Sequence, residues 1–211
     1  MSPTMTSKTT RRVMDAPTRL FHWLFALCFV GAYLTSESER VQQFHAAFGY
    51  TIVALLVFRL LYGWLGPRPV RWSSLLTKLR SGWTWCRSLR GLDDVFGAQA
   101  RAGQNFALVL ATSGLLVLAV PLLLSGHVLY IDSYDWLEEV HEFAANIMLL
   151  LVVAHLAWLL VLSVLRRTNL ARPMWLGHVP GTGPDLVAQP RYWMAVVLFA
   201  SAVAFGVWAA I

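Results

Sequence analysis

The chain has 211 residues, of which 57% are hydrophobic and only 13% are charged. Soluble domains carry roughly 25% charged residues, so this composition excludes a water-soluble globule, and the high hydrophobicity excludes intrinsic disorder. Two cysteines are too few for a disulfide framework or a four-ligand zinc site, and the net charge of +6 has to be explained by its distribution along the chain.

Five apolar runs are long enough to cross a membrane as helices, which takes about 20 mainly apolar residues each. Because the runs are continuous and do not alternate, they favour helices over the strands of a barrel. The sequence therefore predicts an all-α integral membrane protein. In chain order the predicted spans are Pro17–Leu34, Phe44–Leu65, Phe106–Leu124, Val140–Leu165 and Tyr192–Ile211.

The first four spans are predicted to form one four-helix core, residues 17–165, after a cytoplasmic segment 1–16. A cytoplasmic linker, residues 166–191, leads to the fifth transmembrane helix, residues 192–211. Within the core, the segment 66–105 has apolar residues at helical spacing among basic ones. This pattern favours a helix that lies on the inner membrane surface, and a solvated basic loop is the alternative.

Basic residues lie almost entirely on one side of the predicted spans. The three segments on that side hold 15 Lys and Arg residues, whereas the two on the other side hold only Arg40. The positive-inside rule therefore places the N-terminus in the cytoplasm and the C-terminus outside. The same distribution explains the net charge without nucleic acid, because these cations lie beside anionic lipid. The basic segments are 1–19, 66–105 and 166–191.

Four histidines lie within or at the edge of the spans, where ionisable residues are costly and mark functional sites. His45 and His141 begin the second and fourth spans on the outer side. His155 follows His141 by 14 residues, on nearly the same helix face and about 21 Å further inward at 1.5 Å per residue. His22 matches His155 in depth. The predicted pairs are therefore His45–His141 (outer) and His22–His155 (inner).

Two neutral imidazoles across an apolar bundle suit haem iron better than other metal centres. Zinc takes three or four ligands, and a di-iron site requires several glutamates inside the bundle. Haem iron needs only two axial ligands, and bis-histidine ligation favours electron transfer because it leaves no open iron position. The small residues Ala26, Gly49 and Ala145, each four residues after a histidine, leave room for a porphyrin edge.

Other polar residues have two interpretations each. Arg59 follows His45 by 14 residues and so lies at the depth of the inner pair, where it either faces the inner haem and its propionates or extends to the nearby interface. His127 is expected to be an interfacial residue, with a quinone site as the alternative. Cys28 and Cys86 are expected to be inert, because their separate positions argue against pairing.

Several short motifs, in this order, resemble the bacterial cytochrome b561 and Ni/Fe-hydrogenase b-type cytochrome family over about residues 13–177. One opens the first span, and others begin and end the second. The fourth span contributes His141-Glu142, Asn146 and His155. The remaining stretches are Val13–Trp23, His45–Tyr50, Arg59–Gly63, Gly66–Arg68, Asn169–Leu170 and Met174–Gly177.

The resemblance implies a four-helix core with two b haems in the bacterial inner membrane, with His22, His45, His141 and His155 as axial ligands. Similar members transfer electrons in respiratory chains between the membrane quinone pool and a hydrogenase, a c-type cytochrome or another periplasmic redox protein. Some relatives instead oxidise superoxide at the outer face and pass the electron to quinone. The fifth span is absent from the shortest members.

The leading hypothesis is a membrane-bound di-haem cytochrome that transfers electrons between quinone and a periplasmic partner, more as an electron-transfer subunit than as a stand-alone enzyme. We assign no catalytic residue, and the oligomeric state stays open. A superoxide:quinone oxidoreductase would need cationic steering at the outer face, where the residues are acidic and suit a basic partner. A haem-free scaffold or transporter would leave the matched depths of the histidines unexplained.

Overall fold

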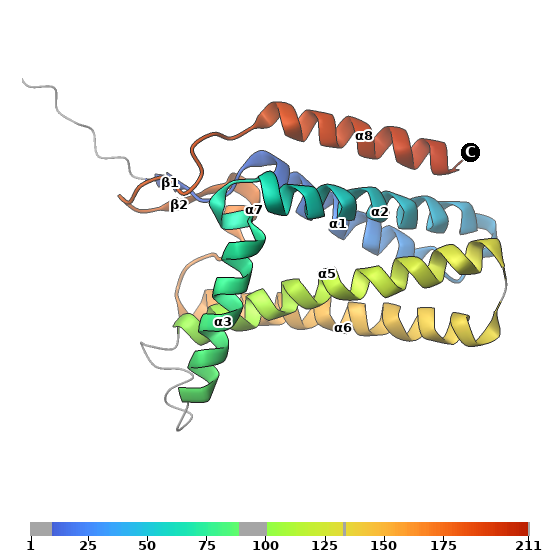
Figure 1. Cartoon of the computed structure of the whole chain (residues 1–211), viewed down its shortest axis with the longest axis horizontal. Coiled ribbons are helices and arrows are strands. Elements are labelled where there is room, and N and C mark those ends of the chain that lie inside the picture. The colour runs from blue at the N-terminus through green and yellow to red at the C-terminus, as the bar shows by residue number, and fades with distance from the viewer. Residues whose placement is uncertain (1–9, 89–100, 133, 211) are drawn as a thin grey trace, which may run out of the picture.

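Residues 10–88, 101–132 and 134–210 are described in the computed structural model (Figure 1). Five long helices run along one another, and each consists mainly of apolar residues. Their backbone groups are satisfied within the helix, which is the requirement for a chain inside lipid. The long helices are α1 (Ala16–Leu34), α2 (Gln42–Leu65), α5 (Arg101–Ile131), α6 (Asp135–Leu165) and α8 (Tyr192–Ala210).

Shorter elements connect the long helices. Two strands pair antiparallel, with Arg12 opposite His178. Most of the short elements lie at one end of the bundle, where α3 runs across the long helices (Figure 1). The short elements are β1 (Thr10–Arg12), η1 (Glu39–Val41), η2 (Arg68–Val70), α3 (Trp72–Ser88), α7 (Arg172–Leu176) and β2 (His178–Pro180).

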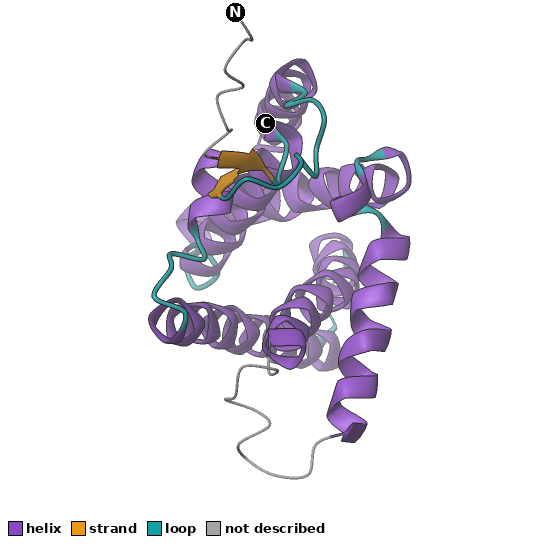
Figure 2. Ribbon diagram, turned by 90° about the vertical axis from the view of Figure 1, so that its left-hand side faces the viewer, coloured by secondary structure: helices purple, strands orange, loops and turns teal. Residues whose placement is uncertain are grey.

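The long helices form two pairs and a third layer. α1 packs against α2, α5 packs against α6, and α8 lies on the far side of the first pair, in contact with both α1 and α2 (Figures 1 and 2). The two pairs meet mainly where α2 approaches α5. The backbones of α1 and α6 hardly approach each other, so the side chains between these helices fill a wider space.

Four helices, α2, α5, α6 and α8, are long and apolar enough to cross a membrane, among the residues that the structure describes. The first predicted span corresponds to α1, which is not in that set; Arg19 and His22 lie in its first two turns and make it less apolar. α1 nevertheless lies beside α2 and α8 in the bundle. α5 and α6 have 31 residues each, longer than predicted, because both helices continue into polar sequence beyond the apolar run.

The predicted interfacial helix corresponds in part to α3. Gly82 of α3 packs so closely on α5 that an added Cβ would come within 2.1 Å of the Phe106 ring. Gly103 of α5 packs as closely on Trp85, where an added Cβ would meet the ring at 2.0 Å. These contacts fix α3 across the end of the bundle. Its location at the membrane surface remains a prediction, and residues 89–100 lie outside the described part of the chain.

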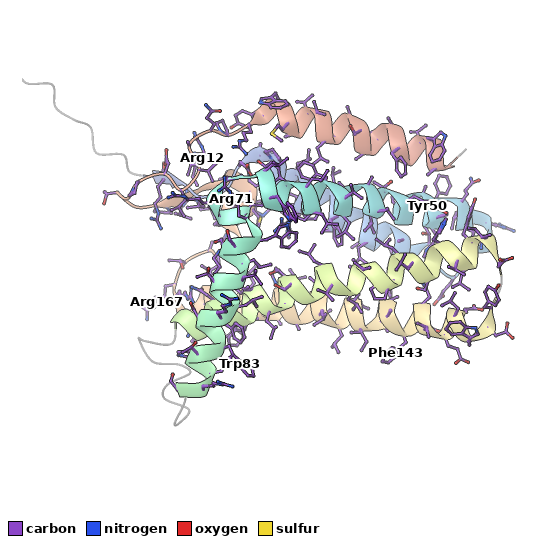
Figure 3. The ribbon with its side chains drawn as sticks, viewed as in Figure 1. Arg12, Tyr50, Arg71, Trp83, Phe143 and Arg167 are labelled. Carbon is purple, nitrogen blue, oxygen red and sulfur yellow. The ribbon has the colours of Figure 1, made fainter. Side chains whose placement is uncertain are left out.

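The two ends of the bundle differ in charge. Arg12, Arg71 and Arg167 lie at the end that carries α3, whereas Tyr50 and Phe143 lie toward the other end (Figure 3). We call these the basic end and the acidic end, because the connection between α5 and α6 is rich in carboxylates. The exposed acidic residues at the acidic end are Asp132, Asp135, Glu138, Glu139 and Glu142.

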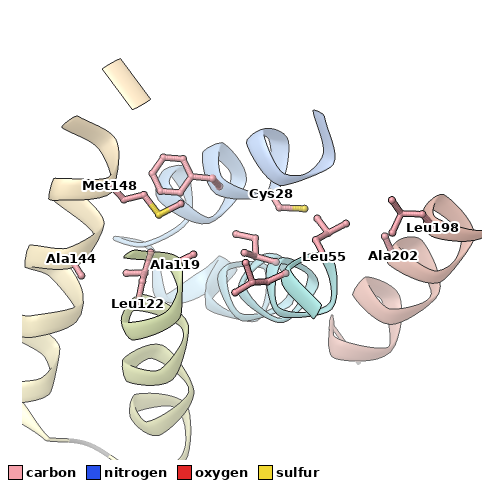
Figure 4. Close-up of a cluster of buried hydrophobic side chains, with 11 residues drawn as sticks. Cys28, Leu55, Ala119, Leu122, Ala144, Met148, Leu198 and Ala202 are labelled. Atoms are coloured by element: carbon pink, nitrogen blue, oxygen red, sulfur yellow. The ribbon is translucent and has the colours of Figure 1, made fainter. Parts of the chain in front are cut away.

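The buried apolar cluster joins all five long helices (Figure 4). Leu55 of α2 is fully buried at its centre, and Met148 of α6 is 1% exposed. Cys28 is buried in this cluster and Cys86 lies on α3; both are free thiols. The cluster also contains Phe29, Ile52, Leu56, Ala119, Leu122, Ala144, Leu198 and Ala202.

Candidate functional site

His45 and His141 face each other between α2 and α6. Their ring centroids are 6.2 Å apart, and the ring planes make an angle of 71°. Metal–imidazole bonds are about 2 Å long, so two imidazoles on opposite sides of one metal ion have ring centres roughly 6 Å apart. The two rings that the sequence pairs at the outer side thus have the separation that a shared metal requires.

Hydrogen bonds fix both rings of the outer pair through Nδ1. Nδ1 of His45 lies 2.8 Å from the carbonyl oxygen of Ala32, which can only accept, so this nitrogen carries the proton. Nδ1 of His141 lies 3.0 Å from Oγ of Ser125. Since the Ser125 hydroxyl donates to the carbonyl of Leu122 at 3.0 Å, it accepts from the His141 Nδ1–H group. Both Nε2 atoms are left with a lone pair for a metal.

Two glycines leave space around the outer pair. A Cβ on Gly126 of α5 would come within 2.9 Å of Cε1 of His141, so the ring occupies the space where a side chain would otherwise lie. At Gly49, one turn after His45, no atom of the other described residues lies within 4 Å of an added Cβ, apart from the backbone of the same helix. The helix face that carries His45 is therefore open beside the ligand, as a large planar group requires.

The inner pair, His22 of α1 and His155 of α6, is also brought together. Both rings are half-buried, and they lie near enough for a charge on one to act on the other. Nδ1 of His155 is buried and has no hydrogen-bond partner among the described residues. Buried polar atoms in native proteins are nearly always hydrogen-bonded. The unpaired nitrogen of this ring is therefore available to a bound group.

Arg59 makes contacts toward the basic end. Its Nη2 donates to the carbonyl of Val70 at 3.2 Å, and its guanidinium lies 4.6 Å from the centre of the Trp72 ring. These contacts agree with the interpretation that the side chain extends to the interface. Nη1 of Arg59 is buried and has no hydrogen-bond partner among the described residues, which leaves its N–H groups for an anionic group. A role of Arg59 toward the inner haem therefore stays a prediction.

His127 lies at the acidic end of α5 and is exposed. Its Nδ1 is 2.9 Å from the hydroxyl of Tyr50 on α2, and the Tyr130 ring packs edge-on against Tyr50. Tyrosines are enriched where membrane meets water. The interfacial placement of His127 that the sequence suggests stays a prediction. Within the part of the chain that the structure describes, the hydrogen bond and ring contact of His127 are with Tyr50 and not with the outer histidine pair.

A polar network at the start of α1 was missed from the sequence. Asp15 is fully buried and caps α1 by accepting from the backbone and hydroxyl of Thr18. It also accepts from the Tyr62 hydroxyl on α2, which in turn accepts from Nη1 of Arg191 at 3.1 Å. The Asp-Ala-Pro-Thr sequence is a recognisable helix start, but no local signal identifies Tyr62 or Arg191 as its partners.

The linker after α6 is bound to the same end of α1. Arg19 donates to the carbonyl of Trp175 at 2.6 Å, and the indole of Trp23 donates to the carbonyl of Met174 at 3.2 Å. Gly177 ends α7 with a φ of 74°, and a Cβ there would lie 2.9 Å from the carbonyl oxygen of Met14. The linker thus holds the turn of α1 that carries His22.

A family model for prokaryotic cytochrome b561 matches residues 13–177. The chain belongs to this family. The match includes α1 to α7 and all four paired histidines and ends before α8. No curated protein and no solved structure matches the chain. As a member of the cytochrome b561 family, the chain is a multi-pass membrane b-type cytochrome of electron transfer, and b-type haem is its cofactor.

The residues present fit haem better than a metal ion held by a cluster of side chains. Among the described residues, no group of three or more His, Cys, Asp or Glu side chains could hold a metal ion. The histidines instead occur two by two, with open space at Gly49 and an unused ring nitrogen on His155. A haem needs two axial nitrogens and apolar space between helices, which this cytochrome b561 bundle provides.

Proposed function

We propose that the protein holds two b haems and transfers electrons across the membrane between the quinone pool and a periplasmic redox partner. The 6.2 Å separation of the His45 and His141 rings carries this proposal. Each haem, when bound, supplies a one-electron iron couple. His45 and His141 would hold the outer haem, and His22 and His155 the inner one.

The protein's own contribution is to fix the ligands in an apolar bundle. The Ala32 carbonyl and the Ser125 hydroxyl hold the outer rings in the tautomer that directs Nε2 to a metal. On α6, His141 and His155 are 14 residues apart, which is about 21 Å along the helix. One helix therefore contributes a ligand to a site in each half of the bundle.

The acidic end supports a basic protein as the periplasmic partner. Its exposed carboxylates produce a negative potential, which attracts a cationic protein surface and repels the superoxide anion. Asp132, Asp135, Glu138 and Glu139 lie there, against the single cation Arg40. This charge favours electron exchange with a protein over superoxide oxidation. Weaker reduction by a basic c-type cytochrome at high salt would support this assignment, whereas salt-independent exchange would contradict it.

We place the basic end in the cytoplasm and the acidic end outside. α8 ends at the opposite end of the bundle from β1, which agrees with an odd number of crossings (Figure 1). A reporter active only in the periplasm, fused after α8, should be active, and the same reporter before β1 should be inactive. The reverse pattern would overturn the orientation.

Haem quantitation with a reduced-minus-oxidised optical spectrum of the purified protein tests the haem count. We expect two low-spin b haems per chain. A single haem per chain would show that one of the two predicted pairs does not hold a haem. No haem at all, under haem-replete expression, would overturn the proposal. Reduction of the haems by an added quinol in membrane vesicles tests the quinone part separately, since a protein with two haems that no quinol reduces takes its electrons elsewhere.

A further inference from the structure

A groove of about 420 Å³ lies between α2 and the start of α8 at the basic end. α2 contributes Phe58, Leu61 and Leu65 to its wall, and the chain that enters α8 contributes Gln189, Arg191 and Met194. The second wall lies beyond residue 177, where the family match ends. The groove is therefore a feature that α8 adds to the matched part of the chain.

Arg191 is held in place at this groove at a conformational cost. Its φ of 54° lies in the left-handed region, which residues other than glycine rarely adopt. Nη1 donates to the Tyr62 hydroxyl, and the guanidinium lies 5.9 Å from the centre of the Tyr62 ring. Strained residues persist where the surrounding contacts require them, and here the contact is with the buried Asp15–Tyr62 pair.

The charge of Arg191 is only partly compensated by these contacts. Its direct partner, Tyr62, is a neutral hydroxyl, and the carboxylate of Asp15 lies one hydrogen bond further away, where it also accepts from Thr18. A guanidinium has five N–H donors, and among the described residues only Nη1 makes a hydrogen bond. The remaining donors are available to an anion in the groove that Arg191 lines.

The groove is lined mainly by apolar side chains, and several of them are exposed. Leu61 is 61% exposed and Leu65 is 76% exposed at the end of α2, and Trp193 is 69% exposed at the start of α8. Tryptophan at this level is typical of the membrane interface. A cation at one end of an apolar, lipid-facing groove is complementary to an amphiphile with an anionic head and an aliphatic tail.

We propose that this groove binds an anionic phospholipid, with its phosphate on Arg191 and an acyl chain along Leu61 and Leu65. Charge complementarity selects the lipid, because a zwitterionic lipid brings its own cation to the phosphate. The bound lipid would fill the space between α2 and α8 and so hold the fifth helix against the bundle. This proposal does not depend on the number of haems or on the redox partner.

Native mass spectrometry of the purified holoprotein, titrated with phosphatidylglycerol or with phosphatidylcholine of the same acyl chains, tests the proposal. We expect tighter binding of phosphatidylglycerol. Arg191→Gln should weaken it about fivefold, the effect of one cation near an anionic membrane surface. Arg68→Gln removes an exposed cation at the same end but outside the groove, and it should leave the affinity unchanged. Equal losses in both variants, or none in Arg191→Gln, would overturn the proposal.

A second pair of variants leaves the Arg191 contacts intact, in case Arg191→Gln does not fold. Leu65→Glu places a negative charge on the groove wall and should abolish the preference for phosphatidylglycerol, whereas Leu65→Gln should keep it. Unchanged selectivity in Leu65→Glu would contradict the site. Inorganic phosphate and a short-chain quinone should not displace the lipid. Displacement by phosphate would identify a simple anion site, and displacement by quinone a neutral occupant; either result overturns the lipid assignment.

Discussion

The hydroxyl oxygen of Ser125 lies 3.0 Å from Nδ1 of His141. The serine is 5% exposed and donates its own proton to the carbonyl of Leu122, so it acts on the imidazole as an acceptor. Acceptors of this kind orient a ligating imidazole and raise its basicity. Ser125 on α5 is thus a positioning residue for the proposed ligand His141 on α6, and its hydrogen bond links the two helices of this pair.

Ser125→Ala should therefore weaken the outer site. The buried Nδ1–H group loses its acceptor, and we expect a 10- to 100-fold lower haem affinity at this site, the usual effect of removing such a partner. A less basic ligand also stabilises ferric iron less, so the potential of the outer haem should rise. Potentiometric titration followed optically measures this shift.

Ser113→Ala is the matched control for Ser125→Ala. The hydroxyl of Ser113 donates to the carbonyl of Val109 within α5, and it has no hydrogen bond to a histidine among the described residues. The Ser113→Ala variant should therefore keep both haems, and both haem potentials should be unchanged. An equal rise of the outer haem potential in both variants would argue against a role of Ser125 in positioning His141. An unchanged outer haem potential in Ser125→Ala would do the same.

Gly126 and Gly114 on α5 offer a second matched pair. A Cβ on Gly126 would come within 2.9 Å of the His141 ring, whereas one on Gly114 would meet only Leu151, at 3.4 Å. Gly126→Ala should displace the ring and reduce the haem content by one per chain. Gly114→Ala should keep both haems and can stabilise the helix by up to about 1 kcal/mol. Full haem content in Gly126→Ala would show that the ring can move without losing its ligand role.

The fold class followed from the sequence because it depends on local patterns, and the pairing of the histidines is a prediction from patterns of the same kind. Apolar runs of membrane length predict helices, and the 14-residue interval between His141 and His155 predicts their shared face. The partners of these rings did not follow. Ala32 contributes a backbone carbonyl, which any residue could supply, and Ser125 has no distinguishing neighbour in the sequence.

Long-range polar contacts could not be predicted either, because no local pattern in the sequence identifies the partners. Asp15, Tyr62 and Arg191 are far apart in the sequence. The packing of α1 against α2 brings Asp15 to Tyr62, and the packing of α8 against both helices adds Arg191. For α1 the sequence and the structure differ in one respect. The sequence predicts it as a span like the other four. Because of Arg19 and His22 it is less apolar than α2, α5, α6 and α8, which meet the length and hydropathy expected of a membrane-crossing helix.

Replacement of single ligands tests the assignment of each pair. His45→Ala should remove the outer haem and His155→Ala the inner one, so each variant should retain one haem with an unchanged low-spin spectrum. His127→Ala is the control, because its contact is with Tyr50 and not with a paired histidine. Loss of a haem in His127→Ala, or two unchanged haems in either ligand variant, would show that the pairing is wrong.

Asp15→Ala should destabilise the protein through the start of α1. It removes the helix cap, worth about 0.5–2 kcal/mol, and leaves the buried Tyr62 hydroxyl without its acceptor, which costs about 1–3 kcal/mol. Thermal unfolding of the purified protein in detergent should show a clearly lower midpoint. The exposed Asp132→Ala at the acidic end should stay within about 0.5 kcal/mol of the parent.

The same variant also separates stability from ligation. Asp15 lies seven residues before His22, and the linker contacts of Arg19 and Trp23 hold the turn between them. If the Asp15 network only stabilises the bundle, Asp15→Ala should keep two haems at low temperature and lose both together on heating. Selective loss of the inner haem below the unfolding transition would instead show that the network positions His22, because His22 is the one proposed ligand on the helix that Asp15 caps.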